Sequence, residues 1–194
     1  MSGAGGSLTP EARRELLDLA RRSIEGYFRR EPLPRLASDR AETFGEPRAL
    51  FVTLRKRGEL RGCIGTLAPD GDLGRTVPRF ARRAALDDPR FGPLDPEELA
   101  ECEIEISVLT PPQPVASVEE IEVGRDGLIL ELAGRSGLLL PQVATEWGFD
   151  RERFLQEVSR KAGLFEDAWR DPSAKLWRFQ AEVFSEGDAP SRAE

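Results

Sequence analysis

An α+β fold built on a mainly antiparallel sheet is the prediction for this chain, and three features of the sequence lead to it. Two apolar runs, 49–54 and 60–67, are separated by turn-forming residues at 57–59, a pattern that predicts a hairpin. Residues 101–109 alternate between apolar and polar side chains, as a half-buried strand does. Segments with helical periodicity are interspersed among these hairpin-like runs, which favours helices flanking an antiparallel sheet.

The elements of the first half follow from caps and periodicity. Thr9 is a good N-cap residue, and Pro10 and Glu11 after it suit the first turn of a helix. Apolar residues then recur on one helical face until about residue 30. A proline-bearing connection over 31–47 leads into the hairpin, and a helix is predicted over 72–86, with Pro78 as its start or a kink.

The second half is predicted in the same way. Further helices are expected over 95–99, 141–147 and 150–162, and strands over 101–109, 127–133, 137–140 and 174–184. We expect the last strand to pair with the early hairpin. The spacing of Trp147, Trp169 and Trp177 is typical of aromatic residues that pack in a core.

Composition excludes several classes of function. The chain of 194 residues has no histidine, which removes Cys–His dyads, Ser–His–Asp triads and histidine-based zinc sites. The net charge of −7 argues against general nucleic-acid binding, although basic residues outnumber acidic ones within 1–90. No apolar run approaches the ~20 residues of a membrane span, and the N-terminus lacks the pattern of a signal peptide. With only two cysteines, we expect a cytoplasmic protein without a disulfide framework.

The run Leu60–Gly65, which reads LRGCIG, is the strongest candidate for a site. Cys63 stands between Gly62 and Gly65 and, by strand alternation, shares a face with Arg61. The positive charge would favour a reactive thiolate, and the glycines would let another group approach the sulfur. The alternative is a small apolar residue packed inside a hairpin. Cys102 lies on the apolar side of its strand and is predicted to be a core residue.

Two glutamates form the second candidate. Glu103 and Glu105 share the polar face of the 101–109 strand, where they could act as general acid and base or simply face water. Glu101 lies on the same face, and three glutamates in a row repel one another, so we expect cationic side chains from the first half to lie opposite them. The basic run Arg55–Arg57 could bind an anionic ligand or be solvated at the hairpin tip.

With these residues identified, the chain resembles the AMMECR domain family over about 10–185. The resemblance is carried by LRGCIG and by the following segments: DPRF (88–91), EIEISVL (103–109), GLIL (127–130), LPQV (140–143), KAGL (161–164) and DAW (167–169). It implies a domain over 9–186 with a large lobe made from both chain ends and a smaller central lobe. The motif cysteine would lie near the cleft between the lobes, and residues 1–8 and 187–194 would be flexible.

The resemblance also bears on function, although it implies no particular reaction. It points to association with a Memo-like protein and a radical SAM protein, and it leaves the cofactor and the oligomeric state unknown. Our leading hypothesis is an enzyme that uses Cys63, with Arg61, Glu105 and Glu103 as catalytic partners. Gly62, Gly65 and Arg90 are the candidate substrate-binding residues, and no metal site is expected. The alternative is a non-catalytic module that presents the LRGCIG surface to a protein partner.

Overall fold

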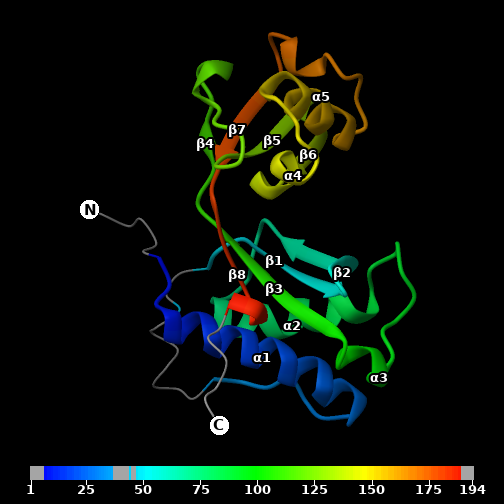
Figure 1. The fold of residues 1–194 in the computed structure, drawn as a ribbon. Helices are drawn as coiled ribbons and strands as arrows, with labels where there is room; N and C mark the ends of the chain where they lie inside the picture. The colour runs from blue at the N-terminus through cyan, green and yellow to red at the C-terminus, as the bar shows by residue number, and fades with distance from the viewer. Residues whose placement is uncertain (1–6, 37–43, 45–46, 189–194) are drawn as a thin grey trace. The chain divides into compact units, whose positions relative to one another are not determined.

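The computed structural model describes residues 7–36, 44 and 47–188, and within it the chain forms two compact units (Figure 1). The first unit contains the N-terminal part of the chain through Val108 and the C-terminal part from Glu182. The second unit is Leu109–Ala181. The expected division into a lobe from both chain ends and a central lobe is therefore confirmed, whereas the domain boundaries at 9 and 186 stay a prediction.

The observed elements follow the predicted order. The helices are α1 (Pro10–Phe28), α2 (Leu73–Leu86), α3 (Pro96–Leu99), α4 (Pro141–Glu146) and α5 (Arg151–Lys161). The strands are β1 (Leu50–Lys56), β2 (Glu59–Thr66), β3 (Cys102–Leu109), β4 (Gln113–Pro114), β5 (Gly127–Leu132), β6 (Arg135–Leu139), β7 (Lys175–Phe179) and β8 (Ala181–Ser185).

In the first unit, α1 and α2 pack together, and α2 lies against a four-stranded sheet of order β2-β1-β3-β8. Strand β1 is antiparallel to both β2 and β3. Alternate residues of the central strands point to the helices and are fully buried, among them Leu50, Val52, Leu54, Ile104 and Ile106. The opposite face therefore carries the residues between them, and this face holds the candidate site.

Local sequence explains the hairpin and the helix starts. Arg57 and Gly58 both have positive φ angles, 53° and 85°, so β1 and β2 are joined by the two-residue turn whose twist matches that of the strands. Thr9 Oγ1 accepts the N–H of Ala12, which is the side-chain cap that the sequence predicted, and Asp72 caps α2 by accepting the N–H of Arg75.

The second unit has its own sheet and core. Its strand order is β4-β7-β5-β6, and α5 packs against β5 and β6. Its core consists of residues from this unit alone: Ile121, Leu128, Leu130, Ala144, Phe154, Leu155, Val158 and Ala162. Asp150 caps α5 by accepting the N–H of Arg153, at the position where the predicted helix begins.

Some predictions for this part of the chain were wrong. Residues 174–184 form two strands: β7 joins the second sheet, and β8 lies beside β3 rather than beside the hairpin β1–β2. The change of sheet occurs at Gln180, whose N–H and C=O both pair with Thr110. The turn between β5 and β6 is Ala133–Gly134, one residue earlier than expected. Trp147 is 73% exposed rather than a core residue.

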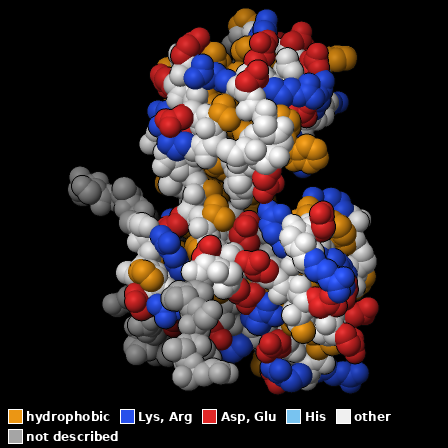
Figure 2. Space-filling view, in the orientation of Figure 1, with side chains coloured by type: hydrophobic (Ala, Val, Ile, Leu, Met, Phe, Trp, Pro, Cys, Tyr) orange, Lys and Arg blue, Asp and Glu red, His pale blue; other side chains and the backbone are white. Residues whose placement is uncertain are grey.

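Most residues of the two predicted mobile ends lie outside the described part of the chain. Those that are described make contacts: the N–H of Leu8 donates to Glu182, and the N–H of Gly187 donates to Glu103. In the view of Figure 2, acidic and basic side chains are interspersed on both units. No helix among the described residues is long and apolar enough to cross a membrane.

Candidate functional site

The register of the first sheet places three polar side chains in one row: the two predicted candidates Cys63 and Glu105, and Thr53 between them. Thr53 on β1 pairs with Cys63 on β2 and with Glu105 on β3. Residues that pair across antiparallel strands project from the same face, so the thiol, the hydroxyl and the carboxylate lie in sequence across three strands. Cys63 is partly exposed, and Thr53 is buried. We call Cys63, Thr53 and Glu105 the polar row.

The thiol of Cys63 is held in its neutral form. Thr53 Oγ1 lies 3.3 Å from the sulfur and donates a hydrogen bond to it. Burial raises the pKa of Cys63, and the charges of Asp88 and Glu105 raise it further, while the Thr53 contact and the Arg90 charge act in the opposite direction. Because an ordinary thiol already titrates near 8.5, Cys63 is a thiol rather than a thiolate at neutral pH.

The backbone of Cys63 contacts two side chains from the loop after α2. Asp88 Oδ2 accepts the N–H of Cys63 at 2.8 Å, and Arg90 Nη2 lies 3.4 Å from its carbonyl oxygen. Asp88 and Arg90 also bind each other through two hydrogen bonds of 2.7 and 3.0 Å. The Arg90 guanidinium and the N–H of Cys63 hold the pKa of the Asp88 carboxyl far below its usual range, although Asp88 is only 4% exposed.

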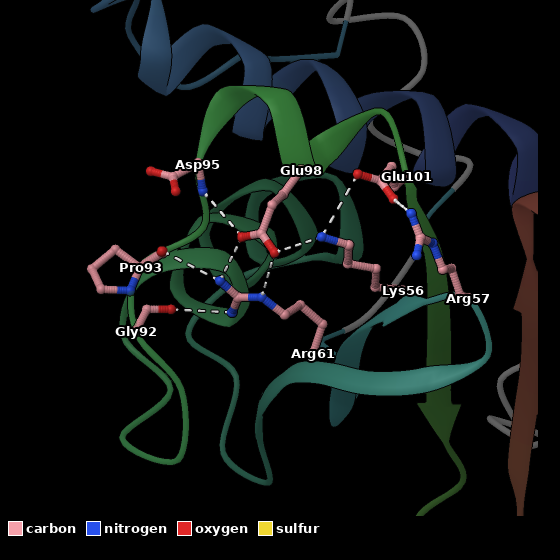
Figure 3. A network of polar contacts seen from close by, with 8 residues as sticks. All are labelled: Lys56, Arg57, Arg61, Gly92, Pro93, Asp95, Glu98 and Glu101. Carbon is pink, nitrogen blue, oxygen red and sulfur yellow. Dashed lines mark hydrogen bonds and ion pairs between the residues drawn. The ribbon is translucent and has the colours of Figure 1, made fainter.

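Arg61, the predicted activating group, points elsewhere (Figure 3). A β-bulge interrupts the β1–β2 register at this residue, because Leu54 pairs with Gly62 while Arg55 pairs with Leu60. The Arg61 guanidinium binds Glu98 at 2.9 Å and donates to the carbonyl oxygens of Gly92 and Pro93. The prediction that Arg61 lowers the pKa of Cys63 is therefore wrong, since the guanidinium that acts on the thiol is that of Arg90.

The network around Glu98 is a structural feature of the first unit. Glu98 also accepts from Lys56 Nζ at 2.9 Å, and Arg57 binds Glu101 at 2.6 Å (Figure 3). The contacts with Arg61 and Lys56 lower the pKa of Glu98 to about 2. Lys56 and Arg57, two members of the basic run, are thus paired with carboxylates in and next to α3. These ion pairs favour neither the anion-binding interpretation of the run nor the interpretation that it is freely solvated.

The two motif glycines are explained by packing. A Cβ atom at Gly62 would lie 2.1 Å from the carbonyl oxygen of Ala84 in α2. A Cβ atom at Gly65 would lie 2.3 Å from the Leu50 carbonyl oxygen and equally close to the Phe51 ring. These positions therefore let α2 and an aromatic ring approach β2 closely. Their proposed role in substrate binding gains no support from this geometry.

The two glutamates have different surroundings. Glu103 Oε1 accepts hydrogen bonds from the hydroxyl of Ser185 and the N–H of Gly187, so it holds the segment after β8. Glu105 lies 3.7 Å from the guanidinium of Arg55 and is close enough to raise the pKa of Cys63. The expectation that cationic side chains lie opposite the glutamates is confirmed for Glu105, which faces Arg55, and for Glu101, which faces Lys56 and Arg57. Of the predicted pair, Glu105 alone belongs to the polar row.

Comparison with known proteins gives the family. The AMMECR1 family model matches residues 17–184. The chain belongs to the AMMECR1 family. It is 46% identical over 186 residues to a protein of Methanothermobacter thermautotrophicus, with 92% of this chain and 96% of the relative covered. It is 45% identical over 181 residues to protein TK0174 of Thermococcus kodakarensis, with 88% of both covered.

A solved structure supports the fold of this AMMECR1-family chain. The crystal structure of the uncharacterised protein PH0010 from Pyrococcus horikoshii is similar, with a TM-score of 0.87 and 41% sequence identity. The match covers 92% of this chain and 93% of that one. The α+β architecture predicted from sequence is therefore confirmed.

Two residues of the site were not predicted from the AMMECR1-family sequence. The sequence pattern does not single out Asp88, although an aspartate that accepts the N–H two residues later is a recognisable turn signal. Thr53 was placed in a strand, but its position between Cys63 and Glu105 depends on the register of three strands. Nothing local in the sequence could have found it.

Within the described part of the chain, the polar row lines none of the three surface cavities. Among the described residues, no three Cys, Asp or Glu side chains are grouped in a way that could hold a metal ion. One surface cavity, of about 1030 Å³, lies between residues 32–36 and the first half of α2, and Cys63 does not line it. Two smaller cavities lie on the second unit. The groups that the row itself presents are a thiol, a hydroxyl and a carboxylate.

Proposed function

We propose that this chain is a non-catalytic binding module, and that the polar row of its first unit contacts a protein partner. The observation that carries the proposal is the state of Cys63: its thiol accepts from Thr53 and has a raised pKa. A thiol kept neutral is a weak nucleophile but a serviceable hydrogen-bonding and packing group. The hydrogen bonds of its backbone to Asp88 and Arg90 support a preorganised contact surface.

The chemistry of the row defines the partner. Glu105 supplies the carboxylate of the row and faces Arg55 at 3.7 Å, and a partner group that donates hydrogen bonds or carries positive charge would complement that carboxylate. The family resemblance makes a Memo-like protein the first partner to test, and a radical SAM protein the second. The two free cysteines support a cytoplasmic location as part of the same proposal.

Binding of a purified Memo-like protein, measured by isothermal titration calorimetry, tests the proposal. We expect Cys63→Ala and Glu105→Gln each to raise the dissociation constant about tenfold, which corresponds to a loss of about 1.4 kcal/mol of binding free energy. Cys102→Ala and Glu131→Gln are the matched controls, since Cys102 is a core residue and Glu131 is exposed on the second unit. The proposal would be contradicted if both site variants kept the wild-type affinity. It would also be contradicted if neither the Memo-like protein nor a radical SAM protein bound the chain.

A thiol-dependent enzyme is the second candidate function. The observation that favours it is the order of the row, because the hydroxyl that contacts the sulfur lies between the sulfur and Glu105. For a proton relay, the Thr53 hydroxyl would turn to accept the thiol proton and pass its own proton to the Glu105 carboxylate once a substrate is bound.

Alkylation by iodoacetamide separates the two functions in a Cys102→Ala background. For a binding module we expect Cys63 to react at pH 7 no faster than a free cysteine, with a rate that rises with pH to a midpoint above about 8.5 because burial raises the pKa of the thiol. A fast reaction at pH 7 that Glu105→Gln slows would instead favour the enzyme.

A further inference from the structure

Cys63 lies at an edge of the first sheet, because β2 is the outermost strand of the order β2-β1-β3-β8. The 3.3 Å contact between the Thr53 hydroxyl and the Cys63 sulfur fits the closer type of antiparallel pair, whose Cα atoms are about 4.5 Å apart. In such a pair the residues exchange no backbone hydrogen bonds with each other. The N–H and C=O of Cys63 therefore point outward, where a further strand would add.

Two side chains occupy the place of that strand. Asp88 Oδ2 accepts the N–H of Cys63 at 2.8 Å, and Arg90 Nη2 donates to its C=O at 3.4 Å. Together they provide the acceptor and the donor that a neighbouring backbone would provide. The two side chains are joined to each other by their own hydrogen bonds, so they act as one unit, which we call the edge clasp.

The segment that carries the edge clasp is itself fixed. Arg61 donates to the carbonyl oxygens of Gly92 and Pro93, and the N–H of Leu94 donates to Ala85 in α2. The Phe91 ring lies within 6 Å of the guanidinium groups of both Arg61 and Arg90, at 5.9 and 5.6 Å. The loop after α2 is thus held beside β2 at several points.

We infer that Asp88 and Arg90 are positioning residues for Cys63: the edge clasp closes β2 at this residue and fixes the direction of its thiol. This assigns a role to the DPRF segment that the proposed function does not include. The inference deepens the proposed function, and it rests on that function only in treating Cys63 as the residue that contacts the partner.

Hydrogen exchange at the cysteine amides tests the inference in the full chain. Labelling with ¹⁵N-cysteine gives two amide signals, Cys63 at the clasp and Cys102 on the central strand β3. Asp88→Asn keeps the shape of the side chain but turns one oxygen into an N–H donor, which faces either the Cys63 N–H or the Arg90 guanidinium. We expect the Cys63 amide to exchange at least tenfold faster relative to Cys102, and the thiol to react several-fold faster with iodoacetamide.

Asp87→Asn is the matched control, because Asp87 precedes Asp88 in the chain but is exposed and contacts Arg83. It should change neither rate. If Asp88→Asn unfolds the chain, Arg90→Lys tests the same point more mildly, since lysine keeps the charge but loses the forked pair of donors. Equal acceleration of both amides, or no change at Cys63, would overturn the inference.

The outcome for the edge clasp is independent of partner binding. A clasp that protects the Cys63 amide in a chain that binds neither proposed partner leaves the inference standing and the proposed function contradicted. If partner affinity depends on Cys63 and Asp88→Asn changes neither that affinity nor the exchange of the Cys63 amide, the proposed function stands and the inference is contradicted.

Discussion

Gly62 lies where the last turns of α2 cross β2, and the missing side chain is what lets the two backbones meet. From the sequence, Gly62 is expected to let another group approach the neighbouring sulfur. Its environment gives a different reason, since its Cβ position is directed at a helix carbonyl and not at the polar row. Arg61 also has a role that its place in the sequence does not predict. The bulge breaks the alternation of β2, so Arg61 and Cys63 need not share a face.

Gly62→Ala should lower the free energy of unfolding by about 1–3 kcal/mol, because an overpacked core must shift to accept the methyl group. Urea denaturation measures the effect. Gly92→Ala is the control, since a Cβ atom at Gly92 has open space around it and should change stability by less than about 0.5 kcal/mol. Similar losses in the two variants would show that contact with Ala84 is not the cause.

Among the elements, α3 is the shortest α-helix of the described residues and depends on charged contacts. Glu98 accepts from Arg61, from Lys56 and, at 3.5 Å, from the N–H of Asp95 at the helix start. One carboxylate therefore joins the hairpin β1–β2 to α3. A helix of this length has little stability of its own, so such tertiary contacts decide whether it forms.

Acid titration of Glu98→Gln tests this link. The pKa of Glu98 is about 2 in the folded chain, below the value of about 4.3 of an unfolded glutamate. The carboxylate thus contributes stability in full above pH 4.3 and loses that contribution as the pH falls towards 2. We expect the wild type to be more stable than Glu98→Gln at pH 7, with a difference that shrinks as the pH falls through this window.

Glu97→Gln provides the comparison for the same helix, because Glu97 is exposed, whereas it is Glu98 that binds the Arg61 guanidinium. Denaturant unfolding is measured from pH 7 to the lowest pH at which the chain is folded. A stability difference between wild type and Glu98→Gln that is independent of pH would contradict the assignment.

At the scale of the whole molecule, the chain forms two cores and passes between them twice. The core of the first unit contains no residue of 109–181, and the core of the second contains only residues of that range. Since each sheet has its own buried face, we expect each unit to respond by itself to the loss of core volume.

Phe154→Ala should cost about 3–5 kcal/mol in the second unit, because Phe154 is fully buried there. Hydrogen exchange by mass spectrometry should show faster exchange in β5–β7 while β1 and β3 stay protected. Phe165→Ala removes the same side chain from a position that is 88% exposed and should leave exchange unchanged. Uniform loss of protection in both units after Phe154→Ala would show a single cooperative core.

Much of the fold could be predicted because its signals are local. The N-caps Thr9, Asp72 and Asp150, the hairpin turn at Arg57–Gly58 and the alternation along β3 each depend on a few adjacent residues. The split of 174–184 into β7 and β8 could not be predicted in this way. Both halves alternate alike, and the sheet that each joins depends on distant partners such as Thr110.

The sequence by itself determined the fold class, the element order and the selection of Cys63 and Glu105 as candidates, because composition, caps and periodicity act over short distances. The tertiary structure alone decided which charges meet the thiol. A bulge at Arg61 and the folding of the loop after α2 bring Arg90 and Asp88 to Cys63 instead. Electrostatic effects and hydrogen bonds depend on distances in space, and these are set by strand register and packing rather than by order along the chain.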